Sequence, residues 1–208
     1  AMSRGLVSID SPAGPTEVMV IADETARADF IAADLLAQAE HDANACPVAV
    51  VTSQELADAV EYELRKQILL LNRRPIAQQA LSENGAILVA ADVEQAIAFS
   101  NEYAPEHLEL MVERPNAWMD KVRNAGAVFL GSYACEAAGD YAAGPNHVLP
   151  TGGLAASYSG LSTRDFVQEM NYLMLQPEGL RRLRPSIEAL AAAEGLEAHG
   201  LSVKKRFS

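Results

Sequence analysis

Five short apolar runs alternate with helix-like stretches over the first two thirds of the chain, and this alternation constrains the fold more than any other feature. In chain order the runs are EVMVIAD, CPVAVVTS, GAILVAAD, LELMV and GAVFL. They are almost continuously apolar, which is typical of strands that are buried on both faces of a parallel sheet. The sequence therefore predicts an α/β fold with a parallel sheet of about five strands, covered by helices on both faces.

The helix-like stretches carry apolar residues at helical spacing, as Phe30, Ile31, Leu35 and Leu36 illustrate. Helices are predicted at residues 25–41, 52–71, 75–81, 92–103 and 116–124. Right-handed crossovers bring the loops at the carboxyl ends of the strands to one edge of the sheet, and we expect ligands there. A GxGxxG fingerprint and a P-loop are both absent from the sequence, so no motif by itself indicates a dinucleotide or triphosphate cradle.

The chain changes character near residue 163. Ser162 and Thr163 predict the start of a helix that includes Met170 and Leu173, and Pro177 and Pro185 predict the starts of two more helical pieces. We therefore expect two parts, an α/β domain over residues 1–162 and a helical C-terminal appendage over residues 163–208.

The composition limits the possible partners. The net charge of −12 disfavours nucleic acids and anionic membranes, and it suits a small polar or cationic substrate. The sequence contains no apolar run of roughly 18 residues and no secretory signal pattern, so we expect a soluble, cytoplasmic protein. The spacing of Cys46 and Cys135 favours two reduced thiols.

The segment EAAGDYAAGPNHVLPTGG, residues 136–153, is the densest group of chemically useful residues. Its glycines and prolines predict a shaped loop that is neither helix nor strand, in which Asp140 and His147 are held in place. The alternative is an ordinary surface loop in which Asp140 caps a turn and His147 is solvated.

Two further pairs could take part in binding or catalysis. Gln38 and His41 are three residues apart at the end of a predicted helix, where both could reach one metal ion; alternatively, His41 only complements the helix dipole. Glu106 and His107 are a possible acid–base pair because an imidazole titrates near neutral pH. Adjacent side chains of a regular strand point to opposite faces, so both residues can serve one site only if Pro105 makes the backbone irregular. The alternative is a solvated pair.

These segments together resemble a known family. GPTEV, QAEH, YAPEHLEL, GAVFLGSYACEAAGDYAAGPNHVLPTGG and AAAEGLEAHGLSV are similar, in order, to the C-terminal half of histidinol dehydrogenases. The resemblance implies a zinc site formed by Gln38, His41, Asp140 and His199. It implies that Glu106 and His107 are the catalytic acid–base pair. It also implies substrate contacts from Thr16, Gln38, His41, His107, Asp140, Glu194 and His199.

The activity implied by this resemblance is the oxidation of L-histidinol through the aldehyde to L-histidine, in histidine biosynthesis, with zinc and NAD. In this family the N-terminal half supplies the NAD contacts, so none is expected in this chain. The resemblance then implies an incomplete Rossmann-like domain that does not turn over by itself. It also implies a homodimer in which the C-terminal tail reaches the partner subunit. Thr16 occupies a position where serine is commoner in the family, and it keeps the hydroxyl but adds a methyl group.

Other functions are compatible with the same residues. The chain could be a metal- or ligand-binding protein without turnover, a fragment whose role is self-association, or a related NAD-dependent dehydrogenase of another small alcohol. For the histidinol reaction, His107 would accept the alcohol proton and Glu106 would activate the water that hydrates the aldehyde.

Overall fold

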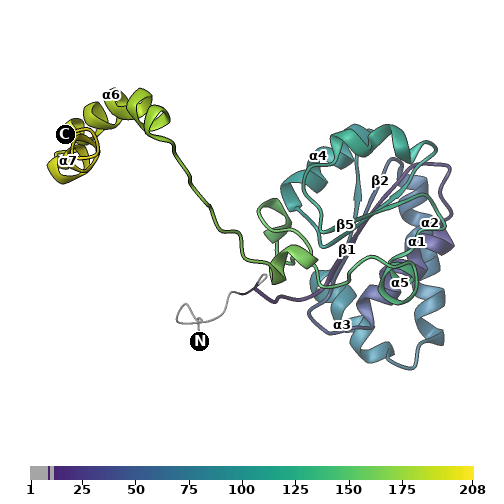
Figure 1. Ribbon diagram of the computed structural model, residues 1–208. Helices are drawn as coiled ribbons and strands as arrows, with labels where there is room; N and C mark the ends of the chain where they lie inside the picture. Colours follow the sequence, from purple (N-terminus) through teal and green to yellow (C-terminus); the bar gives the residue numbers. More distant parts are fainter. Residues whose placement is uncertain (1–8, 10–11) are drawn as a thin grey trace. The chain divides into compact units, whose positions relative to one another are not determined.

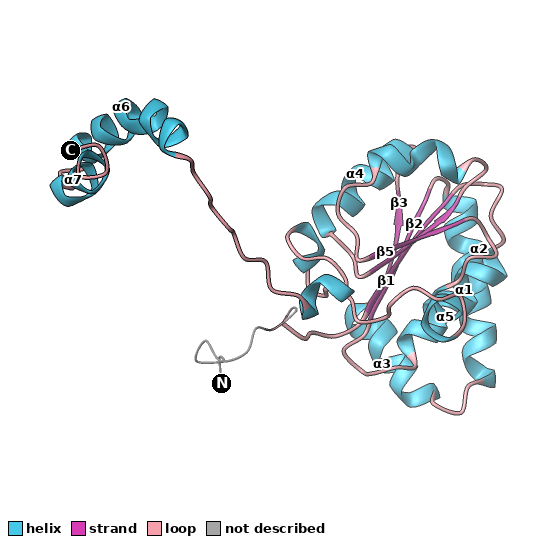
Figure 2. Ribbon diagram, viewed as in Figure 1, coloured by secondary structure: helices cyan, strands magenta, loops and turns pink. Residues whose placement is uncertain are grey.

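The computed structural model describes residue 9 and residues 12–208, which form two compact units with a boundary after Phe166. The first unit contains a five-stranded sheet, drawn in magenta in Figure 2. Every neighbouring pair of strands is parallel, and the strand order is β3-β2-β1-β4-β5. The strands are β1 (Glu17–Ala22), β2 (Cys46–Val51), β3 (Ala86–Val89), β4 (His107–Met111) and β5 (Ala127–Leu130). The predicted α/β fold with a parallel sheet of about five strands is confirmed.

Helices cover both faces of this sheet (Figure 1). On one face lie α1 (Ala28–Ala39), α2 (Gln54–Gln67), the short 3-10 helix η1 (Ile68–Leu70) and α3 (Arg74–Asn84). On the other face lies α4 (Val93–Tyr103). Alternate residues of β1 supply the two cores, so that Val20 packs in the core with α1 and Ile21 packs in the core with α4.

The remaining elements of the first unit are short. They are η2 (Pro115–Lys121), α5 (Glu136–Tyr141), η3 (Leu154–Ala156) and η4 (Thr163–Phe166). The predicted irregular loop from residue 136 is therefore wrong in its first six residues. The side-chain oxygen of Glu109 accepts the backbone N–H of Glu136 at 2.8 Å, which satisfies one of the free donors at the start of α5. Residues 142–153 are irregular apart from a turn, as predicted.

The predicted helix through Met170 and Leu173 is also wrong. Only the 3-10 turn η4 forms, and residues 167–176 are without helix or strand. Met170 and Leu173 are 68% and 85% exposed, so an amphipathic helix here would have no buried face to stabilise it.

The second unit consists of this irregular segment, α6 (Pro177–Ala193) and α7 (Glu197–Lys204). The predicted C-terminal helices are confirmed, although α6 continues through Pro185 where the sequence predicted a new start. Ala191 of α6 and Val203 of α7 are buried, and the two helices pack against each other. Over the described residues, no helix combines the length and apolar character that a membrane span requires.

Candidate active site

The chemically useful residues of the first unit gather at the amino-terminal edge of the sheet. Thr16 and Glu106 immediately precede β1 and β4, and His107 is the first residue of β4. His41 follows α1, which returns the chain to the beginning of β2. These side chains do not lie at the carboxyl-terminal edge where ligands were expected, because all four residues lie on segments that enter strands. Glu136 and Asp140 reach the same group from α5, which follows β5.

The backbone between α4 and β4 is irregular, as the sequence predicts. Ala104 ends α4 in the left-handed conformation with φ of 55°, and Pro105 follows it. This joint lets Glu106 and His107 face one another, with 3.7 Å between Oε2 of Glu106 and Nδ1 of His107. Both residues are buried, at 6% and 3% exposure. The alternative of a solvated pair is thus excluded by their burial.

The Glu106 carboxylate is held by the residues that enter β1. Its Oε2 atom accepts the Thr16 hydroxyl at 2.7 Å and the Glu17 backbone N–H at 2.9 Å. Two donors on one oxygen fix the orientation of the carboxylate. Thr16, predicted as a substrate contact, therefore donates its hydroxyl to Glu106 in this structure.

The His107 ring has one occupied and one free nitrogen. Its Nδ1 atom lies 2.9 Å from the Glu17 carbonyl oxygen, which can only accept, so Nδ1 carries the hydrogen. Its Nε2 atom is buried and has no hydrogen-bond partner among the described residues. Nε2 lies 3.9 Å from Oδ1 of Asp140, so the free nitrogen and that carboxylate are neighbours.

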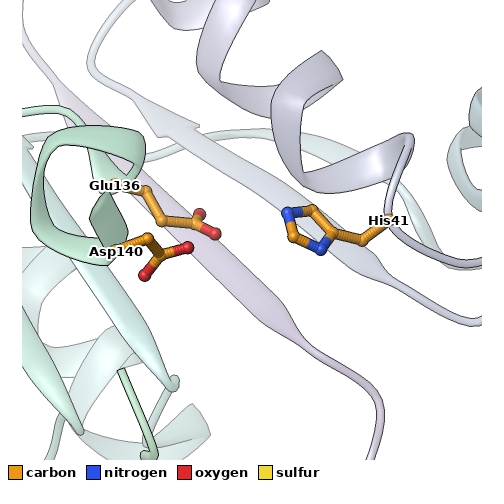
Figure 3. A group of neighbouring side chains, drawn as sticks. All are labelled: His41, Glu136 and Asp140. Atoms are coloured by element: carbon orange, nitrogen blue, oxygen red, sulfur yellow. The ribbon is translucent and has the colours of Figure 1, made fainter. Parts of the chain in front are cut away.

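Asp140 belongs to a group of three side chains that could hold a metal ion. One ligand atom from each of His41, Glu136 and Asp140 lies within 4.8 Å of the other two, and the two carboxylates of α5 face the imidazole at the end of α1 (Figure 3). Glu136 was missed by the sequence reasoning. Its position four residues before Asp140 would place both on one side of a helix, a signal that was lost when this segment was predicted to be a loop.

This donor set fits zinc, which proteins bind through imidazole nitrogen and carboxylate oxygen. Gln38, one turn before His41, is completely buried, and neither atom of its amide has a hydrogen-bond partner among the described residues. Buried amides are rarely left unsatisfied, so this amide is consistent with a missing ligand.

The acidic groups of the site repel one another. Burial, followed by the nearby charges of Asp140 and Glu106, raises the pKa of Glu136 to about 8. In β4, burial and the nearby charge of Asp34 raise the pKa of Glu109 well above its ordinary value. A cation bound between the carboxylates would relieve this repulsion.

The other predicted residues lie on different elements. Glu194 and His199 belong to the second unit, at the end of α6 and within α7, and both are exposed. His147 is exposed in the irregular stretch after α5.

Comparison with known proteins identifies the family. The model of the family described as "Histidinol dehydrogenase" matches residues 1–207. Histidinol dehydrogenases of Bacillus cereus and Methanosarcina mazei are 47% and 48% identical to this chain, over 98% of it in each case. A crystal structure of histidinol dehydrogenase from Elizabethkingia anophelis superposes with a TM-score of 0.92 at 45% identity, and the match covers 97% of this chain and 46% of that one. The chain spans about half the length of the curated relatives it matches, 47% for each of the two named here. By these matches the chain belongs to the histidinol dehydrogenase family.

Proposed function

We propose that this chain is the zinc- and substrate-binding half of a histidinol dehydrogenase, which oxidises L-histidinol through the aldehyde to L-histidine with NAD. The observation that supports this most directly is the buried Glu106–His107 pair, whose free imidazole nitrogen lies 3.9 Å from Asp140 in the group that could hold a metal. A base beside a metal-binding group suits the oxidation of an alcohol that can also bind a metal.

Zinc would be held by Gln38, His41, Asp140 and His199, and the position of Glu136 fits an additional or alternative ligand. When bound, zinc supplies a Lewis acid that attracts nitrogen ligands such as the imidazole and amine of histidinol. When bound, NAD supplies the hydride acceptor. Its contacts would come from the part of the relatives' length that this chain does not span.

The residues of this chain have separate tasks in the proposed reaction. His107 receives the alcohol proton on Nε2, because the Glu17 carbonyl keeps the hydrogen of the neutral ring on Nδ1. Glu106 takes a proton from the water that hydrates the aldehyde, and the Thr16 hydroxyl keeps its carboxylate oriented. The proposed substrate contacts are Thr16, Gln38, His41, His107, Asp140, Glu194 and His199.

The proposed enzyme is a homodimer. In support, the segment that leads into α6 exposes large apolar side chains, including Tyr172, Leu173 and Met174, each at least 85% exposed. Stable soluble proteins rarely leave large groups of apolar side chains exposed to water. We therefore propose that a second copy of this chain packs on these side chains.

Calorimetry with purified chain tests the zinc and substrate sites. Zinc is titrated first and L-histidinol second, into wild type, His41→Ala and His147→Ala. We expect His41→Ala to bind zinc at least about tenfold more weakly, since it loses a first ligand, and to lose the histidinol signal. His147→Ala, a change of the same residue type at an exposed position, should match wild type.

Equal zinc affinity in wild type and His41→Ala would contradict the proposed site. The proposed division of labour is tested separately, by mixing the chain with zinc, NAD and histidinol. We expect no NADH absorbance at any protein concentration, and its appearance would contradict the proposal that the NAD contacts lie outside this chain.

A further inference from the structure

Glu17, the first residue of β1, has a buried carboxylate that accepts two backbone N–H groups and pairs with no cation among the described residues. It is 5% exposed. Its Oε1 atom accepts the Gly152 N–H at 3.0 Å, and its Oε2 atom accepts the Glu106 N–H at 3.4 Å. Burying a carboxylate costs free energy unless hydrogen-bond donors surround it. The two amide N–H groups lower this cost for Glu17.

The backbone of Glu17 contacts the same neighbours. Its N–H donates to Oε2 of Glu106 at 2.9 Å, and its carbonyl oxygen lies 2.9 Å from Nδ1 of His107. Glu17 and Glu106 thus form two reciprocal hydrogen bonds, in which the backbone N–H of each residue donates to the carboxylate of the other. One residue therefore contacts the backbone and side chain of Glu106 and the ring of His107.

Gly152 connects Glu17 to the end of the irregular segment that begins after α5. Gly152 has a φ of 63°, a backbone conformation that favours glycine. Beside it, Thr151 is buried, and a side chain at Gly14 would collide with the Thr151 hydroxyl. The end of this segment is therefore packed against the residues that enter β1, and the Glu17 carboxylate is its charged anchor.

We propose that Glu17 is a positioning residue for the acid–base pair. It holds Glu106 and His107 in one orientation and fixes the segment after α5 at Gly152, without touching the substrate. The inference builds on the proposed function, in which Glu106 and His107 move protons. The sequence pattern at Glu17 predicts only a strand, and the family comparison assigns this residue no role.

The Glu17→Gln variant separates this role from simple burial. The amide has nearly the same shape but replaces one acceptor oxygen with an NH₂ group, which would face a backbone N–H and cannot accept from it. One of the two anchoring hydrogen bonds is therefore lost. Glu24→Gln is the matched control, since Glu24 is exposed in the turn after β1 and its side chain forms no hydrogen bond with the described residues.

The test uses nuclear magnetic resonance of the 15N-labelled 208-residue chain. It measures hydrogen exchange at the amides of Gly152 and Glu106, and the ring nitrogen shifts of His107, which report its tautomer. In Glu17→Gln we expect exchange at one of these amides to rise roughly three- to tenfold, as for one lost buried hydrogen bond. The His107 shifts should remain those of the Nδ1–H form, because the Glu17 backbone carbonyl that accepts from Nδ1 is retained, and Glu24→Gln should resemble wild type.

Unchanged exchange at both amides, Gly152 and Glu106, in Glu17→Gln would overturn the proposal. If this variant does not fold, Glu17→Asp keeps the charge and the backbone contacts, but its carboxylate is one methylene too short to reach both amides. The same loss is expected there, and wild-type behaviour would again overturn the inference. Zinc affinity should change by less than about twofold, because among the described residues the Glu17 carboxylate hydrogen-bonds only to the Glu106 and Gly152 amides. A wild type that binds no zinc would refute the proposed function but leave the amide-exchange measurement interpretable.

Discussion

The Nε2 atom of His107 lies 3.9 Å from the Oδ1 atom of Asp140, which joins the first residue of β4 to the last turn of α5. The predicted base and a predicted zinc ligand are therefore neighbours, although 33 positions separate them in the chain (140 minus 107). A hydrogen bond to the Glu17 carbonyl fixes the His107 ring, and the short helix α5 positions Asp140. Substitution of the acidic residues around this pair can therefore measure what each contributes to zinc binding or to stability.

Glu136→Gln should weaken zinc binding by roughly 10- to 100-fold, the range found when a metal site loses a ligand or its support. The amide keeps the shape but removes a negative charge from the group with His41 and Asp140. Competition with a chromophoric chelator measures the change, with Glu24→Gln as the exposed control. Affinity equal to wild type would show that the metal does not use Glu136.

His199→Ala should reduce zinc affinity most at high protein concentration. The family resemblance implies that His199 reaches the site of the partner subunit, so the complete ligand set forms only in a dimer. We expect the wild type to bind zinc weakly at low concentration and more tightly as the concentration rises, whereas the variant stays weak. Zinc titrations at several protein concentrations measure this. Identical, concentration-independent affinities would rule out a shared site.

The metal-free protein should become less stable as the pH rises from about 4 to 6, that is, from the ordinary carboxyl pKa to the raised pKa of Asp34. Burial raises the pKa of Asp34 to about 6, and the pKa of the adjacent Glu109 is raised further, by burial and by Asp34. Between the unfolded and folded pKa values the native state holds more protons than the unfolded state. The free energy of unfolding therefore falls as pH increases, and the stability is full only below the unfolded pKa values.

Urea denaturation in the presence of a chelator measures this dependence, which we expect to be on the order of 1 to 3 kcal/mol across the window. Glu109→Gln removes one charge from the pair and should flatten the curve. A wild type whose stability rises with pH over the same window would contradict the raised pKa values of Asp34 and Glu109.

Deletion of residues 163–208 should abolish the proposed dimer. The deleted segment includes Met170, Tyr172 and Leu173, whose exposed apolar surface is the main source of free energy for association. Screening at physiological salt limits the opposing repulsion between the negatively charged copies. Light scattering coupled to size exclusion gives the mass of both forms. A truncated chain that remains dimeric would show that other residues join the subunits.

The sequence predicts the sheet and the acid–base pair because their signals are local. Each strand is a continuous apolar run, and Glu106 and His107 are adjacent, so neither inference requires knowledge of distant contacts. The helix α5 was missed because the carboxylate that accepts the N–H at its start, Glu109, lies 27 residues earlier in the chain. The predicted helix at 163–173 was wrong for the opposite reason, since apolar residues at helical spacing do not form a helix without a surface to pack on.

By itself, the sequence determined the α/β class, the parallel sheet and the residue types available for proton transfer and metal binding. Only the tertiary structure decided which edge of the sheet holds them and which groups support them. Glu17 is 89 residues from Glu106 and 135 from Gly152, and its hydrogen bonds with them exist only after β1, β4 and the segment after α5 have come together. An apolar pattern can be recognised from neighbouring residues, whereas the role of a buried carboxylate depends on hydrogen-bond donors that only folding brings close to it.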